Sequence, residues 1–448
     1  MKNLSSGLLF LLLLFAIAFV SGCKEDENEF DTTEDFSAEV AHKWFDLTRK
    51  LTKETAGFTP PVAARAYAYT GIALYESVAG GSDHLHSLAG QISGLSQSAV
   101  SKPNSTEEYH WGIVANSCLT DIVKKLYPNA TDENKTRIDS LSLAVEQSLS
   151  AGVDVEVFDR SVAHGKTVAD EIYNYSVTDG QDQGYTSNFP ASYIPPVGDG
   201  FWVPTPPAFL NAMQPYWGDV RPFVSDNITG TQPEAPIPFS TEATSAFYEE
   251  AYEVYETGQN LTAEQTLIAQ FWSDDPGKTG TPGGHSISIT TQVLRKQNAN
   301  LGLAAETYVK VGMAINDAFI SCWRCKYLFN LLRPITYIKQ YIDPDYTTLL
   351  TTPPFPEYTS GHSVQTGAMA TILTDMFGNN YAFTDSTHVS RTDIDGSPRS
   401  YDSFMDAANE TAISRLYGGI HYRKAIEKGV IQGSQIGQNI IQKIEYHH

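Results

Sequence analysis

The sequence predicts an all-α protein, whose main part is one large helical domain built from two packed helix bundles. Apolar residues recur with the spacing of helix faces along most of the 448 residues. No segment alternates strongly between apolar and polar residues, as a strand with one buried face would. Roughly 410 residues follow the N-terminal 36, and this length is ample for a large core.

Residues 1–22 have the features of a lipoprotein signal peptide. Lys2 precedes an uninterrupted apolar run at 8–20, which is too short to span a membrane comfortably. The run ends in Val-Ser-Gly-Cys, which looks like a bacterial lipoprotein cleavage box and makes Cys23 the expected lipidated residue. The alternative is an ordinary secretory signal followed by an incidental cysteine.

Residues 23–36 are mostly acidic, lack apolar spacing and are expected to form a solvated tether. We therefore expect a protein that is lipid-anchored in the bacterial cell envelope, in the periplasm or on the outer-membrane surface, and that meets the membrane only through this anchor. The formal net charge of −22 argues against nucleic acid or an anionic membrane as a partner.

Residues 37–448 form the predicted helical domain. The segment that starts at Pro60 is rich in alanine and opens with the residue that favours a first helical turn. Residues 180–240 are rich in proline, glycine and aromatic residues without a period, as in a functional or packed excursion. A proline-rich loop is expected at 342–359. The predicted helices are 36–56, 60–78, 107–127, 132–151, 153–175, 241–258, 263–273, 286–298, 302–332, 361–377, 403–417 and 421–445.

The cysteines after Cys23 are few. Cys322 and Cys325 have the spacing of a redox motif, but they lie in a helical pattern with no strand before it. No second pair completes a zinc site. We interpret them, together with Cys118, as small core residues.

Two basic residues near position 330 are the first part of a candidate anion site. Lys326 and Arg333 are seven residues apart, which places them on one face of a predicted helix. Trp323 shares this face and is a candidate for lining the pocket, while Pro334 ends the helix or starts the next segment. An ammonium and a planar guanidinium together hold two or three oxygens of a tetrahedral anion.

Ser360, Gly361 and His362 form the second part, where the proline-rich loop meets a helix. The first N–H groups of a helix have no partner within it and attract anions. Ser360 adds a hydroxyl, and Gly361 lets the backbone approach a ligand closely. The third part is Arg415 and His421, which can reach one ligand only if the chain breaks between them. Gly418-Gly419 supplies that break, so we expect His421 to begin the last helix.

The three parts together resemble the superfamily of vanadium-dependent haloperoxidases and type-2 phosphatidic acid phosphatases. The motifs of that superfamily are Lys-x6-Arg-Pro, Pro-Ser-Gly-His and Ser-Arg-x5-His, and this chain departs only in having Thr359 in place of proline. The stretches at 60–78, 271–285 and 315–326 look like soluble bacterial haloperoxidases, in particular iodide-oxidising enzymes. On this resemblance His285 becomes a second candidate for lining the pocket.

The resemblance implies a vanadate cofactor ligated by the imidazole of His421. It implies that His362 moves protons when hydrogen peroxide binds, and that the enzyme oxidises a halide, iodide before bromide, to hypohalous acid. The vanadium would act as a Lewis acid and keep its oxidation state. The vanadate oxygens would be bound by Lys326, Arg333, Ser360, Gly361 and Arg415.

Phosphate has the shape of vanadate, so the residues alone leave two further functions open. In an acid phosphatase that acts on phosphate monoesters, His421 would attack phosphorus to form a phosphohistidine, and His362 would protonate the leaving alcohol. A surface lipoprotein that only captures phosphate is the third function, although simple capture does not require two histidines.

Overall fold

The computed structural model describes residues 30–448, so the predicted signal peptide and Cys23 lie outside the described residues. The described part is mostly helical, which confirms the predicted fold class. Its α-helices are α1 (Glu39–Glu54), α2 (Pro60–Ala79), α3 (Trp111–Leu126), α4 (Asp132–Leu149), α5 (Val155–Ser176), α6 (Asp226–Thr229), α7 (Ala246–Gln259), α8 (Ala263–Phe271), α9 (Thr281–Lys296), α10 (Leu301–Phe329), α11 (Pro334–Tyr341), α12 (Gly361–Phe377), α13 (Phe404–Tyr417) and α14 (Arg423–Lys443).

Shorter elements accompany these helices. One antiparallel hairpin, which the sequence did not predict, pairs β1 (Phe383–Asp385) with β2 (Arg399–Tyr401), with Phe383 opposite Tyr401. The 3-10 helices are η1 (Thr33–Asp35), η2 (Gly184–Thr186) and η3 (Trp217–Asp219).

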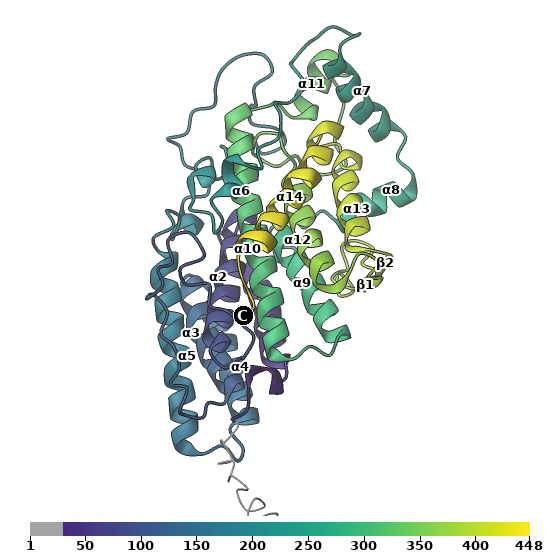
Figure 1. Ribbon diagram of the computed structural model, residues 1–448. Helices are drawn as coiled ribbons and strands as arrows, with labels where there is room; N and C mark the ends of the chain where they lie inside the picture. Colours follow the sequence, from purple (N-terminus) through teal and green to yellow (C-terminus); the bar gives the residue numbers. More distant parts are fainter. Residues whose placement is uncertain (1–29) are drawn as a thin grey trace, which may run out of the picture.

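Two groups of helices pack on the two sides of the long helix α10 (Figure 1). α2, α3, α4 and α5 form the first group, while α9, α12, α13 and α14 form the second. The two groups share one hydrophobic core, which extends from Trp44 and Tyr67 to Phe404 and Ile436. α10 therefore belongs to both groups and joins them.

Glycines set the closest helix contacts around the second bundle. A Cβ atom at Gly433 of α14 would lie 2.0 Å from the carbonyl oxygen of Val364 in α12, and one at Gly367 would lie 2.7 Å from that of Val430. The two backbones therefore approach more closely than any side chain would permit. This contact fixes the N-terminus of α12, where the Ser-Gly-His motif lies.

Residues 180–240 form a packed excursion, as predicted from their composition. Trp202 and Trp217 are fully buried, and the Trp202 amide donates to the carbonyl oxygen of Asn330 at 2.7 Å. The carboxylate of Asp317 in α10 accepts the amides of Phe223 and Val224 at 2.9 and 3.0 Å. The excursion is thus tied to α10 and lies over its C-terminal end.

Cys118, Cys322 and Cys325 are buried and unpaired, as expected for core residues. Among the helices of residues 30–448, none combines the length and apolar character that a membrane crossing requires.

Candidate active site

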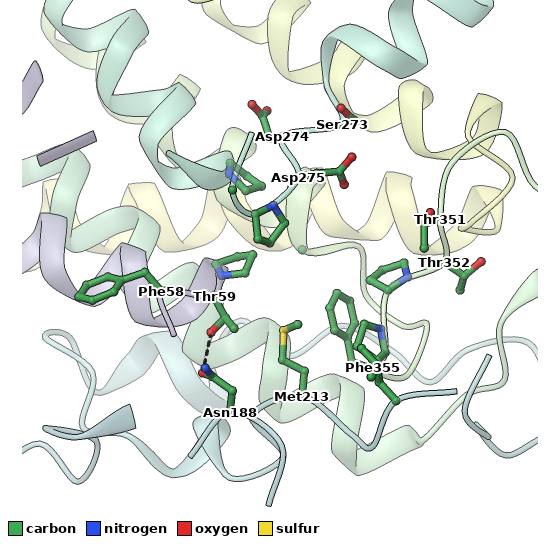
Figure 2. Close-up of a pocket in the computed structure, with 18 of the residues that line it drawn as sticks. Phe58, Thr59, Asn188, Met213, Ser273, Asp274, Asp275, Thr351, Thr352 and Phe355 are labelled. Atoms are coloured by element: carbon green, nitrogen blue, oxygen red, sulfur yellow. Dashed lines mark hydrogen bonds between the residues drawn. The ribbon is translucent and has the colours of Figure 1, made fainter. Parts of the chain in front are cut away.

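The three motif segments come together at a cavity of about 620 Å³, although Lys326, Arg333 and Ser360 are not among the residues that line it. Gly361, His362, Arg415 and His421 are part of its lining. The rest of the lining comes from distant parts of the chain, and Figure 2 shows Met213 and Phe355 across the opening from Asp274 and Asp275. The cavity therefore has motif residues at its base and largely apolar walls.

Lys326 lies in the last turn of α10 and is fully buried. Its ammonium donates to the carbonyl oxygens of Pro356 and Glu357, each at 3.0 Å, and to that of Thr359. All three of its N–H groups therefore have protein acceptors. Burial lowers the pKa of Lys326 to about 8. Lys326 supplies a positive charge beneath the site and has no free N–H group.

Arg333 does not share a helix face with Lys326, so that prediction was wrong. Asn330 has a positive φ of 48° and ends α10, and the chain then runs extended to Arg333, the residue before α11. The Arg333 side chain is fully buried. Its Nε donates to Phe355 O at 2.8 Å and its Nη1 to Ile420 O at 2.7 Å, whereas Nη2 has no partner.

The Ser-Gly-His motif forms the predicted loop-to-helix junction. Ser360 is the N-cap of α12, and its hydroxyl accepts the amide of Ser363 at 3.4 Å. A Cβ atom at Gly361 would lie 3.3 Å from the ring of Trp323, so this position has little room for a side chain. Trp323 lines the cavity, as expected.

His362 follows at the cavity base and is neutral. Burial, and then the charge of Arg415, hold its pKa well below the ordinary value. The backbone of Ser273 lies beside the ring and opposes this lowering of the pKa, while Nε2 has no partner. A neutral ring with a free Nε2 is suited to exchanging a proton with a ligand in the cavity.

Arg415 and His421 are brought together by the predicted break. α13 ends at Tyr417, and Gly419 turns the chain with a φ of +76°. His421 precedes α14 by two residues, however, and does not begin that helix as expected. Arg415 Nη1 donates to Trp272 O at 2.8 Å, while Arg415 Nε is buried without a partner.

Glu357 orients His421 and is a site residue that the sequence motifs did not predict. The Nδ1 of His421 donates to Glu357 Oε1 at 2.7 Å, and the amide of Tyr422 donates to the same oxygen at 2.9 Å. His421 Nε2 therefore keeps its lone pair, which accepts from Arg333 Nη1 at 3.1 Å. Burial, and then Arg333, hold the pKa of His421 well below the ordinary value, whereas burial raises that of Glu357 to about 8. An acid three residues before the motif serine was the available signal.

Several polar atoms of the site lack a hydrogen-bond partner. Burial lowers the pKa values of Arg333 and Arg415, each to about 10. Beyond the effect of burial, both guanidinium groups lie close enough to His421 to lower its pKa as well. Buried polar groups normally have partners, yet Arg333 Nη2, Arg415 Nε and His362 Nε2 have none. Two unpartnered guanidinium donors lie beside the lone pair of His421 Nε2, which accepts from Arg333 Nη1. An oxyanion such as vanadate requires donors of this kind and an imidazole lone pair, so these residues fit that cofactor.

His285 lies behind the cavity wall and does not line the cavity itself. Its Nδ1 contacts the carboxylate of Asp274, which does line the cavity, at 2.8 Å. Trp323 therefore lines the cavity, whereas His285 is separated from it by Asp274.

The fold and this site define a class of helical-bundle enzymes with a buried oxyanion pocket. Residues 306–448 match the family model of the second helical-bundle domain of VCPO. The chain is similar to the crystal structure of a bacterial vanadium-dependent iodoperoxidase, with 38% identity over 92% of this chain and 97% of the other and a TM-score of 0.83.

The fold is also similar to a bacterial vanadium-dependent chloroperoxidase, at 16% identity. The apo form covers 87% of this chain and 94% of the other with a TM-score of 0.67, and the holo form covers 87% and 92% with a TM-score of 0.65. No curated protein matches the chain. The extent and identity of the match to the iodoperoxidase show that the chain belongs to the vanadium-dependent haloperoxidase family.

Proposed function

We propose that this protein is a vanadate-dependent peroxidase that uses hydrogen peroxide to oxidise iodide to hypoiodous acid. Iodide gives up two electrons and receives one peroxide oxygen, and the other oxygen leaves as water after protonation. The observation that carries the proposal is the set of unpartnered donors around His421, in a chain similar to an iodoperoxidase over most of its length.

In this proposal His421 ligates vanadate through Nε2, because Glu357 holds the proton on Nδ1. Arg333 Nη2 and Arg415 Nε bind oxygens of the anion, and the Ser360 hydroxyl and the Gly361 amide bind others. The five positions come from three segments, so the anion is held from several directions. Lys326 contributes its charge from beneath.

Bound vanadate supplies a Lewis acid that activates peroxide without a change in oxidation state. His362 exchanges a proton with peroxide at Nε2, and its neutral state at ordinary pH makes it a proton acceptor first. The Ser273 backbone lies beside this ring, and Nε2 has no protein partner that would compete with the anion. The apolar residues Met213 and Phe355 limit the water that reaches the site and leave room for a large, weakly hydrated halide.

The same lone pair on His421 supports an alternative function, an acid phosphatase. A neutral imidazole whose other nitrogen is held by Glu357 is also a competent nucleophile toward phosphorus. Parallel assays on one preparation distinguish the two functions.

Apo-protein should gain iodide peroxidation when vanadate is added, and phosphate should inhibit loading because it occupies the same donors. A preparation that hydrolyses phosphate monoesters efficiently and is indifferent to vanadate would establish the alternative. Binding of phosphate without any turnover would instead establish a capture protein.

We further propose that the protein is a lipoprotein of the bacterial cell envelope, anchored through Cys23. The apolar run at 8–20 and its Val-Ser-Gly-Cys ending support this location. Cys23→Ala should release the protein from membranes of the native host. Mass spectrometry of the native N-terminus is the direct measurement, and an unmodified residue 23 would contradict the anchor.

A further inference from the structure

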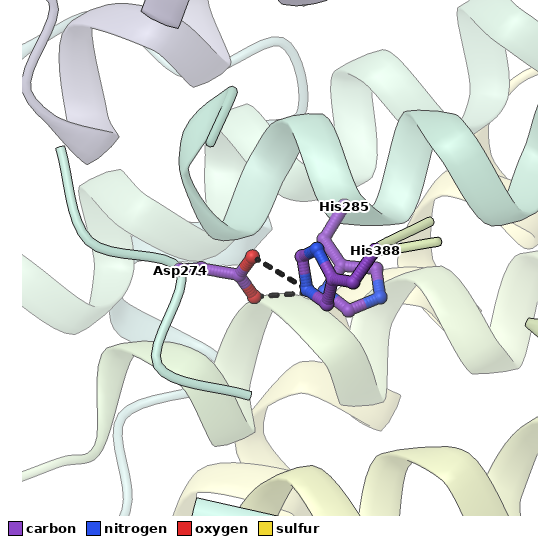
Figure 3. Close-up of side chains that lie close together, drawn as sticks. All are labelled: Asp274, His285 and His388. Atoms are coloured by element: carbon purple, nitrogen blue, oxygen red, sulfur yellow. Dashed lines mark hydrogen bonds and ion pairs between the residues drawn. The ribbon is translucent and has the colours of Figure 1, made fainter. Parts of the chain in front are cut away.

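Behind the cavity wall, a buried histidine lies between two carboxylates. His285, in the first turns of α9, contacts Asp274 Oδ2 through Nδ1 at 2.8 Å and Asp385 Oδ2 through Nε2 at 2.7 Å. Asp385 is the last residue of β1, and Asp274 follows α8. All three side chains are at most 1% exposed. Figure 3 shows Asp274 directed at the ring of His285, with His388 beside it.

The contacts define the protonation of this group. An ionised carboxylate only accepts hydrogen bonds, so a ring held by two carboxylates donates from both nitrogens and is an imidazolium. Although burial opposes it, the charges of Asp274 and Asp385 raise the pKa of His285 to about 10. Burial likewise opposes ionisation of Asp274, but the charge of His285 holds the pKa of that carboxyl far below its usual value.

A metal ion is the competing occupant, because Asp274, His285 and His388 bring three ligand-type atoms together. His388 Nε2 lies 3.5 Å from Asp274 Oδ1. A cation would need the lone pair of His285 Nδ1, and that nitrogen already makes a hydrogen bond of 2.8 Å. The proton satisfies both carboxylates without any displacement, so the geometry favours the proton.

The group connects to the site through the segment 272–274. The ring of Trp272 stacks on His285 with centroids 4.4 Å apart, and Trp272 O accepts from Arg415. The Ser273 backbone lies beside the ring of His362 and raises its pKa against the effect of burial. Asp274, the next residue, is fixed by His285. One short segment thus lies beside both an anion-binding arginine and the proton-transferring histidine.

We propose that Asp385, His285 and Asp274 form a positioning unit, in which the His285 imidazolium fixes segment 272–274 so that Arg415 and His362 face the anion. This role rests on the proposed function. His285 touches neither cofactor nor substrate and acts through the backbone of Trp272 and Ser273. The β1–β2 hairpin supplies Asp385, whose carboxylate accepts a hydrogen bond from Nε2 of the His285 ring.

The first experiment uses the unmodified protein. Nitrogen-15 NMR of histidine-labelled protein at neutral pH should show one ring with both nitrogens protonated, and Asp385→Asn should change that signal specifically. Elemental analysis of the same sample should find no divalent metal at stoichiometric amount. A stoichiometric metal, or a singly protonated ring at His285, would overturn the proposal.

The second experiment compares His285→Gln with a matched control, His42→Gln. His42 is also buried and bonds Tyr308 at 3.0 Å, but it lies on α1. A misplacement of about 1 Å lowers turnover by about 100-fold. We expect that loss in kcat for His285→Gln with an unchanged KM for iodide, together with about tenfold weaker vanadate binding by the apo-protein. His42→Gln should lose thermal stability only.

Equal effects of His285→Gln and His42→Gln on vanadate binding and kcat would show that His285 is merely structural and would refute the proposal. Failure of the proposed function has a different signature, because the unmodified apo-protein would then bind no vanadate or gain no peroxidation from it. Asp385→Asn, which keeps the shape of Asp385 and removes its charge, should fall between the unmodified protein and His285→Gln in both measurements.

Discussion

Among the basic residues of the site, Arg415 is the one whose contribution to anion binding can be tested most directly. Its Nη1 donates to Trp272 O, whereas its buried Nε has no partner and is available to vanadate. Arg415→Gln removes the charge and the free donor, but it keeps an amide that can donate to a carbonyl. A charge-assisted hydrogen bond contributes about 1.5–3 kcal/mol, so we expect the Kd for vanadate to rise by about 10- to 150-fold.

Equilibrium dialysis of apo-protein against vanadate measures this Kd directly, without reliance on turnover. Arg65→Gln is the matched control. Arg65 is also buried, but it lies on α2 and donates to Asp179 at 2.6 Å and to Ser176 O at 2.7 Å. The control should lower the melting temperature and leave the Kd unchanged. An unchanged Kd for Arg415→Gln, or an equal rise in both variants, would refute the assignment of Arg415 to the anion.

Lys326→Met should weaken vanadate binding less than Arg415→Gln does. It should also lower the unfolding free energy by several kcal/mol, because three buried carbonyl groups lose their donor at about 1–3 kcal/mol each. Equilibrium dialysis tests the first part and denaturant titration the second. His421→Ala should abolish vanadate binding, whereas His362→Ala should keep much of it and slow turnover by about 10²–10⁴-fold; the opposite pattern would mean that the two roles are reversed. The flanking carboxylates, against the effect of burial, raise the folded-state pKa of His285 from its ordinary value of 6.5 to about 10. Its charge therefore stabilises the fold fully below pH 6.5, and this contribution is lost as pH rises through 10. The difference in unfolding free energy between the unmodified protein and His285→Gln should therefore shrink over that window, and a difference independent of pH would contradict the charge.

Local sequence patterns were sufficient to predict the helical fold and the positions where the motifs meet helices. The helix that starts at Pro60 and the helix start at Gly361 follow from single residues and were predicted. The prediction that Arg333 shares a helix face with Lys326 was wrong, because Asn330 adopts a left-handed conformation and ends the helix. The sequence around Asn330 has a helical pattern and does not predict this end. Helical spacing identifies a face only while the helix continues, and one polar residue near its end is enough to stop it.

Contacts between distant segments could not be predicted in this way. Glu357 reaches His421 across 64 residues, and Asp385 reaches His285 across 100. The position of Glu357 near the motif serine suggests a role in the site, but no local pattern shows which distant side chain either acid contacts. Their partners are defined by the approach of α12 to α14 and by the hairpin that follows α12. The groups that orient the reactive side chains were therefore visible only in the structure.

The surroundings of Lys326 restrict which cation this position tolerates. Three carbonyl oxygens converge on one nitrogen, as water oxygens do around a dissolved ammonium ion, so the protein itself solvates the charge. An ammonium can direct three N–H groups at such a shell, whereas a guanidinium is flat and points its donors outward in one plane. An arginine at position 326 would keep the positive charge but could not donate to all three carbonyl oxygens. Lys326 and Arg333, the two basic residues of this motif, are therefore not interchangeable.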